Sequence, residues 1–340
     1  MKKIKINFCD FYSEFDKKSS FLYKILQKFY IVEISEQPDY LFYSVFGIEH
    51  TKYNNCVKIF YTGENIIPDF NECDYAIGFN DITFEDRYIR YLCNYNSDLT
   101  RKNISKELIN RNFCNFIYSN GSMGEGAKLR QDFFTKLSKY KHIDAPGKIC
   151  NNMIAKELEP RFGDWYKSKT EFLKKYKFTI AFENSQTNGY LTEKFFQPIQ
   201  ANSIPIYWGA LDISKDFNTK AFINCNDYKN FDEVIEKIEY LDNNDEAYLA
   251  MLKEPIEKEN SRLKNQDEKL EKFLINIIKK GNKPFDKDPM SIRKRLIYTN
   301  NTHQKENIIS KIFSIQNEYT NGKKHKIIKI MGFKIKIATK

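Results

Sequence analysis

The 340-residue sequence lacks several features that mark whole classes of protein. No stretch approaches the ~18 uninterrupted apolar residues of a membrane-spanning helix, and the N-terminus alternates like a strand, without the apolar block of a signal peptide. The seven cysteines show no C-x-x-C spacing, which disfavours a zinc site or a disulfide framework. The four histidines are scattered, which argues against histidine-centred metal or triad chemistry. We therefore expect a protein made and kept in the cytosol, with reduced cysteines.

Acidic residues are absent from the last 20 residues, which hold seven lysines. Residues 1–320 carry 48 basic and 45 acidic side chains, so most of the net charge of +10 belongs to the tail. A basic tail indicates an anionic surface as its partner more than a nucleic acid. A basic nucleic-acid-binding protein is the non-enzyme alternative, and it requires a basic stripe on the folded body. The near-neutral balance of that body disfavours it.

The length suits two domains, and apolar residues at 41% suffice for their cores. Strand-like and helix-like segments alternate, which predicts α/β domains with parallel sheets. A polar stretch near residues 95–112 indicates the crossing between them. We expect an N-terminal domain at 1–110, a C-terminal domain at 111–300 and a basic amphipathic tail at 301–340. The predicted strands are 4–8, 40–45, 57–61, 75–79, 113–118, 178–182 and 204–207, and the predicted helices are 19–30, 125–139, 256–280 and one capped by Asn230.

The most informative segment is 177–209, KFTIAFENSQTNGYLTEKFFQPIQANSIPIYWG. It is typical of a strand, a polar loop, a helix and a second strand. Ligands in such folds bind past the carboxyl ends of the strands, and a helix N-terminus carrying Lys194, with Thr192 as its cap, suits a diphosphate. The alternative is an ordinary capped helix with a solvated Glu-Lys pair. Pro198 indicates that this helix either starts late or is kinked.

This segment resembles the donor-binding signature of the α-1,3-fucosyltransferases, inverting enzymes that use GDP-fucose. The signature stands here as Phe-Glu-Asn-Ser at 182–185, Tyr-Leu-Thr-Glu-Lys at 190–194 and Pro-Ile-Tyr-Trp-Gly at 205–209. Residues 59–91 and 213–241 are similar to further blocks of the bacterial members. The resemblance implies two Rossmann-like domains facing each other across a cleft (GT-B type), with acceptor recognition mainly N-terminal and donor binding mainly C-terminal.

The resemblance also implies roles for individual residues. It places the general base in the Gly-Glu-Asn loop after strand 57–61, which makes Glu64 the catalytic candidate; a plain turn carboxylate is the alternative. Arg130 would neutralise the diphosphate, with Lys128 in reserve because the loop 121–129 is longer than in the family. Glu193 would bind hydroxyls of the ribose or the sugar. The candidate donor-binding set is Arg130, Asn184, Ser185, Tyr190, Thr192, Glu193 and Lys194.

No metal or other cofactor is expected. The Asp-x-Asp triplet at 286–288 fits a solvated turn better than a Mn²⁺ or Mg²⁺ site. The resemblance also points to a fold that uses Arg and Lys in place of a metal. We expect Trp208 to be a core residue and not a platform on which a sugar stacks.

The sequence thus predicts an inverting α-1,3-fucosyltransferase that transfers L-fucose from GDP-fucose to a GlcNAc hydroxyl of an N-acetyllactosamine-like glycan. The setting implied is Lewis-type antigen synthesis on lipopolysaccharide or a related surface glycan. The alternative is the same fold with another nucleotide sugar or an α-1,4 linkage. In residues 321–340, lysines alternate with apolar residues, which favours peripheral attachment to the anionic inner face of the cytoplasmic membrane. Strand-like alternation and Gly332 leave the conformation of this tail open, and a disordered solubilising end is the alternative.

Overall fold

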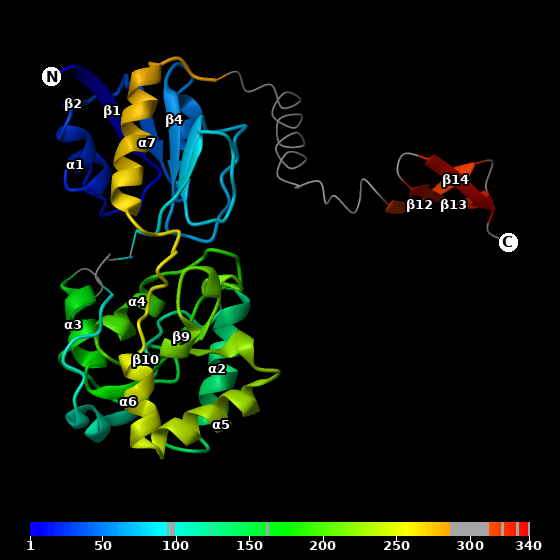
Figure 1. Cartoon of the computed structure of the whole chain (residues 1–340). Coiled ribbons are helices and arrows are strands. Elements are labelled where there is room, and N and C mark those ends of the chain that lie inside the picture. Colours follow the sequence, from blue (N-terminus) through cyan, green and yellow to red (C-terminus); the bar gives the residue numbers. More distant parts are fainter. Residues whose placement is uncertain are drawn as a thin grey trace. The chain divides into compact units, whose positions relative to one another are not determined.

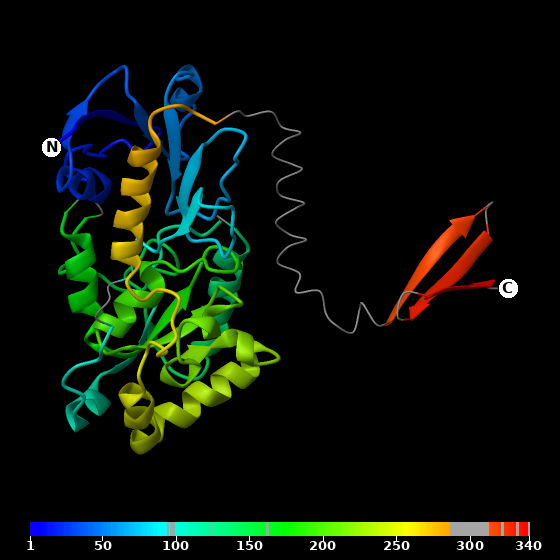
Figure 2. The ribbon, with the colours of Figure 1, turned by 45° about the horizontal axis from the view of Figure 1, so that its top comes forward.

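The computed structural model describes residues 1–93, 95, 99–122, 124–160 and 163–285, together with the backbone of 313–320, 323–330 and 333–338. The chain forms two compact units, Met1–Phe285 and Asp286–Lys340. Figures 1 and 2 show the first unit as helices and parallel strands. In the described part of the chain, no helix has the length and apolar character needed to cross a membrane.

The first parallel sheet of this unit has the strand order β2-β1-β3-β4-β5-β6. Its strands are short and largely apolar, and β3 and β5 are buried along their whole length, as strands covered on both faces must be. The predicted strands of the N-terminal half are confirmed, whereas β2 and β6 were not predicted. The elements are β1 (Lys3–Cys9), α1 (Phe21–Gln27), β2 (Ile31–Ile34), β3 (Tyr40–Tyr43), the 3-10 helix η1 (Glu49–Lys52), β4 (Val57–Tyr61), β5 (Tyr75–Gly78) and β6 (Tyr88–Arg90).

Helix α7 (Gln266–Lys280) also belongs to the first sheet. Its buried residues Leu270, Leu274 and Ile277 share a hydrophobic core with β1, β3, β4 and β5, and Figure 1 shows it alongside β1 and β4. The expectation that residues 111–300 form one C-terminal domain is therefore wrong for this helix. The apolar spacing of a helix reveals which face is buried but not which sheet it covers. Gly281, at φ +94°, ends the helix.

The second parallel sheet has the order β11-β10-β9-β7-β8. Strands β9 and β10 pair from Phe178 with Ile204 to Phe182 with Trp208, so their carboxyl ends lie side by side. Asn230 caps α5 as predicted, accepting from two backbone amides. The elements are η2 (Lys106–Asn110), β7 (Asn112–Asn115), α2 (Glu125–Leu137), β8 (Ile143–Asp144), α3 (Trp165–Leu173), β9 (Tyr176–Phe182), α4 (Glu193–Gln200), β10 (Ile204–Trp208), η3 (Ile213–Lys215), η4 (Thr219–Ala221), β11 (Ile223–Asn224), η5 (Cys225–Asp227), α5 (Phe231–Asp242) and α6 (Asp245–Lys253).

Side chains from both sheets meet in a shared core and in ion pairs. Phe79, which follows β5, packs its ring 4.7 Å from that of Tyr190, which precedes α4. Beside this contact, Arg90 of β6 donates to Asp216 at 2.9 Å. Trp208 is 7% exposed and belongs to the core of the second sheet, which confirms it as a core residue. Within the described residues, which include all seven cysteines, no disulfide is formed.

The second unit contains a three-stranded antiparallel sheet of β12 (Phe313–Thr320), β13 (Lys323–Ile330) and β14 (Phe333–Ala338). The expected tail at 301–340 thus contains a sheet, and the strand-like alternation seen in its sequence indicated the right conformation. The Asp-x-Asp triplet at 286–288 lies outside the described residues.

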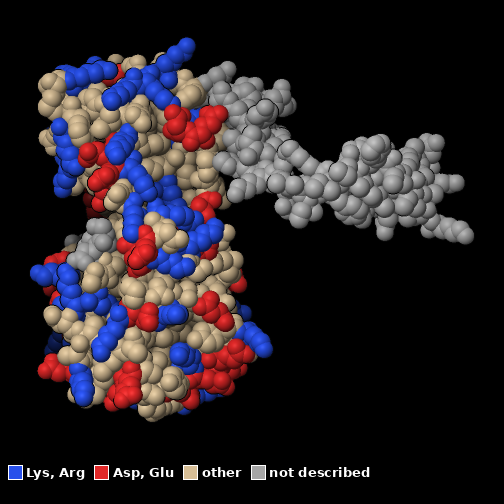
Figure 3. Space-filling view, viewed as in Figure 1, with Lys and Arg blue, Asp and Glu red and all other residues tan. Residues whose placement is uncertain are grey.

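The surface of the first unit mixes both signs of charge on the face shown in Figure 3, where acidic and basic side chains are interspersed. Such mixing agrees with the near-neutral balance of residues 1–320. A nucleic-acid backbone calls for a continuous basic stripe. The viewed face therefore favours the enzyme over the nucleic-acid-binding alternative.

Candidate active site

The candidate site is built around a buried carboxylate at the end of β9. Glu183 has no exposed surface. The Thr192 amide donates to its Oε1 at 2.8 Å, and the Thr192 hydroxyl lies 2.8 Å from its Oε2. Burial raises the pKa of Glu183, although Lys194 and the hydrogen bonds from Thr192 oppose the shift. The Thr192 amide, the Thr192 hydroxyl and the Lys194 ammonium all lie close to these oxygens, and together they tie the end of β9 to the start of α4.

Helix α4 begins as the sequence predicts. The Thr192 hydroxyl caps it by accepting from the Lys194 amide at 3.3 Å. Pro198 lies inside the helix, so the late start considered from the sequence is wrong. A helix N-terminus presents unpaired amides and a partial positive charge, which together attract anions. The start of α4 therefore offers an anion-binding position at the carboxyl edge of the second sheet.

Lys194 stands between two carboxylates at this helix start. Its ammonium lies 3.4 Å from Glu183 Oε2 and 3.4 Å from Glu193 Oε1. Burial alone would raise the pKa of Glu193, but the charges of Lys194 and Lys169 lower it to about 2. The reverse holds for Lys194: burial lowers its pKa, and the two glutamates raise it further than burial lowers it. Glu193 and Lys194 are therefore both ionised at neutral pH.

Arg130 lies against the loop that joins β9 to α4, residues 183–192, which is the predicted donor loop. It is 1% exposed, donates to Asn184 Oδ1 at 2.9 Å and also donates to the Asn120 carbonyl. Its guanidinium carbon lies 4.1 Å from the centre of the Tyr118 ring, a cation–π contact. Burial lowers the pKa of Arg130. The reserve candidate, Lys128, is exposed on the same helix, so the structure joins Arg130 and not Lys128 to the predicted donor loop.

Two glycines allow helix α2 to approach this loop so closely. A Cβ at Gly126 would lie 2.0 Å from the Glu183 carbonyl oxygen, and one at Gly124, where φ is +75°, would lie 2.2 Å from that of Asn184. The Gly126 amide donates to the Asn184 carbonyl at 3.0 Å. This contact between backbones sets Arg130 beside Asn184. Sequence motifs did not reveal this approach, although the Gly-x-Gly spacing could have indicated it.

The predicted base belongs to the first sheet but adjoins the donor loop. Glu64 follows β4 and is partly exposed, and its amide donates to the Thr62 hydroxyl at 2.9 Å. The next side chain, Asn65, donates to the hydroxyls of Ser185 and, at 2.8 Å, Thr187. The structure thus brings the Gly-Glu-Asn loop and the Phe-Glu-Asn-Ser loop together.

Tyr190 also belongs to the donor loop. It is 2% exposed, and its pKa is raised by burial and by the neighbouring charges of Glu183 and Glu64, with Lys194 opposing. Gly189, at φ +82°, precedes it, and the Gly189 amide donates to Asp212 at 2.7 Å. A Cβ at Gly189 would lie 2.3 Å from the Phe79 carbonyl oxygen. This turn therefore needs glycine, and it fixes where Tyr190 enters the site.

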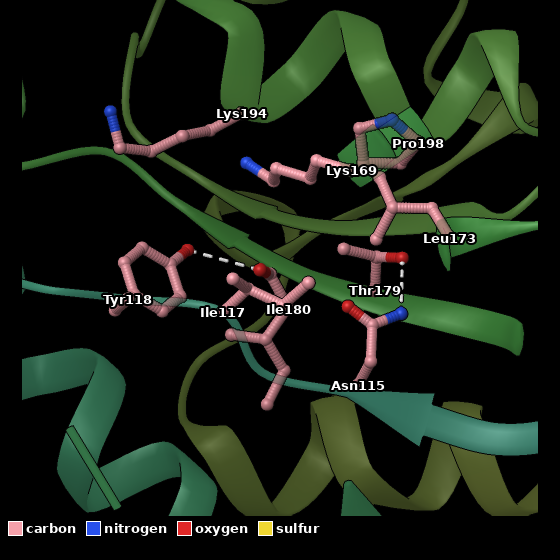
Figure 4. Close-up of a pocket in the computed structure, with 9 residues that line it drawn as sticks. All are labelled: Asn115, Ile117, Tyr118, Lys169, Leu173, Thr179, Ile180, Lys194 and Pro198. Atoms are coloured by element: carbon pink, nitrogen blue, oxygen red, sulfur yellow. Dashed lines mark hydrogen bonds between the residues drawn. The ribbon is translucent and has the colours of Figure 1, made fainter. Parts of the chain in front are cut away.

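A small cavity behind α4 adds a residue that sequence reasoning missed (Figure 4). It is lined by Tyr118, Lys169 of α3 and Lys194 of α4, together with apolar and neutral polar side chains. Lys169 is 8% exposed, and burial lowers its pKa to about 8. No motif marks this lysine in the sequence. Within the described residues, no group of three or more His, Cys, Asp or Glu side chains could hold a metal.

Solved glycosyltransferases share this fold. The structure superimposes on a crystal structure of an α1,3-fucosyltransferase with a TM-score of 0.65 and 30% sequence identity, covering 84% of this chain and 93% of that one. A second structure, of an α1,3-fucosyltransferase with GDP-fucose, gives a TM-score of 0.62 and 29% identity, with 80% and 90% covered. The fold and the site therefore define the class of sugar-nucleotide-dependent glycosyltransferases.

Family comparisons narrow this class. Residues 6–96 match the model of the α-(1,3)-fucosyltransferase FucT N-terminal domain. Residues 94–273, about half of the chain, match the C-terminal model of glycosyltransferase family 10 (fucosyltransferase), and the chain belongs to this family. The α-(1,3)-fucosyltransferase FucT of Helicobacter pylori is 34% identical over 281 residues, which are 70% of this chain. The aligned region spans 56% of that relative's length.

Proposed function

We propose that this chain is an inverting α-1,3-fucosyltransferase that uses GDP-fucose. The acceptor is a GlcNAc hydroxyl in an N-acetyllactosamine-like glycan, on lipopolysaccharide or a related surface glycan. Family membership supports the reaction class, and the relatives described as binding GDP-fucose support the donor. We also propose a GT-B arrangement, with the acceptor on the side of the first sheet and the donor on the side of the second.

The observation that carries the proposal is the contact between the two loops. Asn65 bridges to Ser185 and Thr187, so Glu64 adjoins the start of α4, where Lys194 and Glu193 lie. A carboxylate near an anion-binding helix start is what inverting transfer needs. The base faces the acceptor, and the cations face the leaving diphosphate.

In the proposed reaction, the Glu64 carboxylate accepts the proton of the acceptor hydroxyl. The hydroxyl oxygen forms a bond to C1 of fucose as the bond from C1 to the phosphate oxygen breaks. Negative charge grows on the departing GDP, and Lys194, Arg130 and the N-terminus of α4 stabilise it. Asn184, Ser185, Tyr190 and Thr192 shape the donor site, and Glu193 accepts hydrogen bonds from hydroxyls of the ribose or the sugar.

The test is nucleotide release with a panel of donors. GDP-fucose, GDP-mannose and UDP-sugars are each incubated with N-acetyllactosamine, and the linkage of any product is determined by NMR. We expect GDP release with GDP-fucose alone and a product fucosylated at O3 of GlcNAc. Turnover of a different nucleotide sugar, or an α-1,4 product, would establish the alternative that the sequence leaves open.

Catalysis without a metal is part of the proposal, because Lys194 and Arg130 supply positive charge where a metal otherwise would. We expect EDTA to leave basal fucosyl transfer largely intact. The measurement is the initial rate before and after chelation, with Mn²⁺ or Mg²⁺ added back. A complete loss restored by either ion would show that transfer needs a metal.

We also propose that the second unit attaches the protein to the anionic inner face of the cytoplasmic membrane. The register pairs Ile315 with Ile328 and Ile328 with Ile335, so these apolar positions share one face of the sheet. Lys329 and Lys334 pair at positions of the opposite face. Lys324 and Lys326 lie at positions of the same face as Ile328. Apolar positions and lysines on one face combine the two attractions of an anionic lipid surface.

A further inference from the structure

The start of α4 carries a surplus of negative charge if only its own neighbours are counted. One ammonium, that of Lys194, lies within 3.4 Å of two carboxylates, Glu183 and Glu193. This trio sums to −1 when all three groups are ionised. A net negative cluster repels a diphosphate, so the start of α4 needs positive charge beyond that of Lys194, and Arg130 is one source of it.

Lys169 is a further source of positive charge, on a different helix. Two side-chain contacts fix α3 against α4: Gln197 Nε2 donates to the Tyr166 carbonyl at 3.1 Å, and the Tyr166 hydroxyl donates to Gln200 at 2.8 Å. The Lys169 side chain lines the same cavity as Lys194, and Figure 4 shows both ammonium groups directed to the same side of it. Lys169 therefore lies beside the cluster at the start of α4 without belonging to that helix.

Burying the ammonium group of Lys169 without a partner is energetically unfavourable. It is 8% exposed, and within the described residues no hydrogen bond or ion pair holds its ammonium. Buried charges are normally paired, because leaving water without a partner is expensive. Its charged neighbours are Glu193, Lys194 and Glu183, and the two glutamates favour the ammonium without contacting it. Such unpaired buried charges concentrate at functional sites.

We propose that Lys169 is a positioning residue for the donor diphosphate. Its charge balances the second carboxylate of the cluster and leaves the positive charge of Lys194 available to the phosphates. This inference rests on the proposed function, since it assigns a partner to the same site. Lys169 acts through Glu193 and Lys194 and transfers no proton to the substrate.

The first test removes the charge of Lys169 and keeps the apolar part of its side chain. Lys169→Met in the full-length protein retains the length and apolar packing of the side chain, and Lys167→Met, at an exposed position of the same helix, is the matched control. GDP affinity is measured by titration calorimetry, and thermal unfolding reports on folding. We expect the dissociation constant to rise about ten-fold for Lys169→Met, as loss of one charge-assisted interaction predicts, and to stay unchanged for Lys167→Met.

The pH dependence of GDP binding gives a signature that a purely structural lysine would not. The pKa of Lys169 is lowered to about 8 by burial, so its charge is present below that pH and lost above it. Lys194 and Tyr118 from the neighbouring elements keep their protons over the same interval, because both of their pKa values are raised. GDP affinity should therefore weaken from pH 7.5 to 9.5 in the unmodified protein and stay flat in Lys169→Met.

A double-mutant cycle tests whether the effect of Lys169 on GDP binding depends on Glu193. If Lys169 balances the charge of Glu193, Lys169→Met should weaken GDP binding less in a Glu193→Gln background than in the unmodified protein. Lys169→Met with unchanged GDP affinity and an unchanged pH profile would overturn the inference, and additive effects in the cycle would overturn the route through Glu193. Failure of the unmodified protein to bind GDP would count against the proposed function itself, so the two failures are distinguishable.

Discussion

Neighbouring side chains of one type have opposite electrostatic environments in this site. Burial raises the pKa of Glu183, whereas Lys194 and Lys169 outweigh burial and lower the pKa of Glu193 to about 2. Glu183 is occupied entirely with Thr192 and Lys194, which makes it a structural anchor of the loop. Glu193 is 34% exposed at its side chain, which leaves it able to reach a ligand. Glu183 therefore supports the loop, whereas Glu193 is placed to contact a ligand.

The assignment of Glu64 predicts a specific kinetic defect. Glu64→Gln keeps the shape and the hydrogen-bonding capacity of the side chain but removes its basicity. We expect kcat to fall by roughly 10²–10⁴ while GDP affinity is unchanged. Initial rates with GDP-fucose and calorimetry with GDP measure the two quantities. Glu85→Gln, an exposed change in the same half, is the control. A Glu64→Gln enzyme with normal kcat at neutral pH would remove Glu64 from the mechanism.

Arg130 and Lys128 are alternative candidates for binding the diphosphate, and substituting each in turn distinguishes them. Arg130 contacts Asn184 at 2.9 Å, and Lys128 is exposed. We expect Arg130→Met to weaken GDP binding roughly ten-fold or more, since a charge-assisted contact is worth about 1.5–3 kcal/mol. Lys128→Met should bind GDP normally. The opposite pattern in calorimetry, with both variants folded by circular dichroism, would show that the long loop shifts the role to Lys128.

Also at the scale of residues, sequence motifs predicted the candidate side chains of the site. The structure brings together the regions of Glu64, Arg130, Asn184 and Lys194 as that reasoning required. Lys169 could not be found this way, because its significance depends on α3 packing against α4. A lysine in an ordinary amphipathic helix carries no local signal of burial.

At the scale of elements, long apolar runs were predictable and short or two-faced ones were not. β4 and β9 are mostly apolar and almost wholly buried, and the polar residues Lys58, Lys177 and Thr179 within them are buried too. β2 was missed, since Ile31 is 54% exposed and Glu33 interrupts the run, as is common in an edge strand. Helix α7 was found but assigned to the wrong sheet. Which sheet a helix covers depends on where the chain crosses back, and its own periodicity does not encode that crossing.

An ion cluster joins elements of both sheets and predicts an acid-sensitive fold. Asp216 has no exposed surface and accepts from Arg262 Nε at 2.9 Å and from Arg90 at 2.9 Å. Burial would raise its pKa, but the bonds from Arg262 and the charge of Arg90 lower it below 3.8. Its contribution to stability is therefore present above about pH 4 and is lost as the pH falls through its folded-state pKa.

We expect Asp216→Asn to lower the free energy of unfolding by about 3 kcal/mol at pH 7, because the largely buried Arg90 loses its anion, whereas Arg262 keeps its pairs with Asp81 and Asp212. The difference between this variant and the unmodified protein should shrink as the pH is lowered below 4. Urea unfolding at several pH values measures both effects. Asp232→Asn, which removes an exposed pair with Lys136, should change the free energy by less than about 1 kcal/mol. Equal small effects from both variants would contradict a stabilising role for the cluster.

At the scale of the whole molecule, the sequence indicated an α/β body and a chemically distinct C-terminal segment. Its charge pattern separated the two, since most of the excess positive charge lies after residue 320. The sheet of the second unit depends on pairings among three strands, so alternation in one strand could suggest it but could not establish it.

Membrane attachment through the second unit predicts a loss of vesicle binding when its lysines are neutralised. Lys329→Gln, Lys334→Gln and Lys336→Gln together alter the face opposite Ile328 and Ile335. At about 1 kcal/mol per lysine, we expect the triple variant to bind vesicles containing phosphatidylserine roughly a hundred-fold more weakly in co-sedimentation. Fucosyl transfer to a soluble acceptor should be unchanged, because no residue of the candidate site is altered.

The control removes the same charge from the first unit through the exposed lysines Lys139, Lys156 and Lys229. If overall net charge alone drew the protein to anionic vesicles, both triple variants would lose binding equally. A separate variant with Ile328→Ser and Ile335→Ser tests the apolar face and should lose binding to neutral and anionic vesicles alike. Vesicle binding that survives both changes in the second unit would show that this sheet is not the membrane anchor.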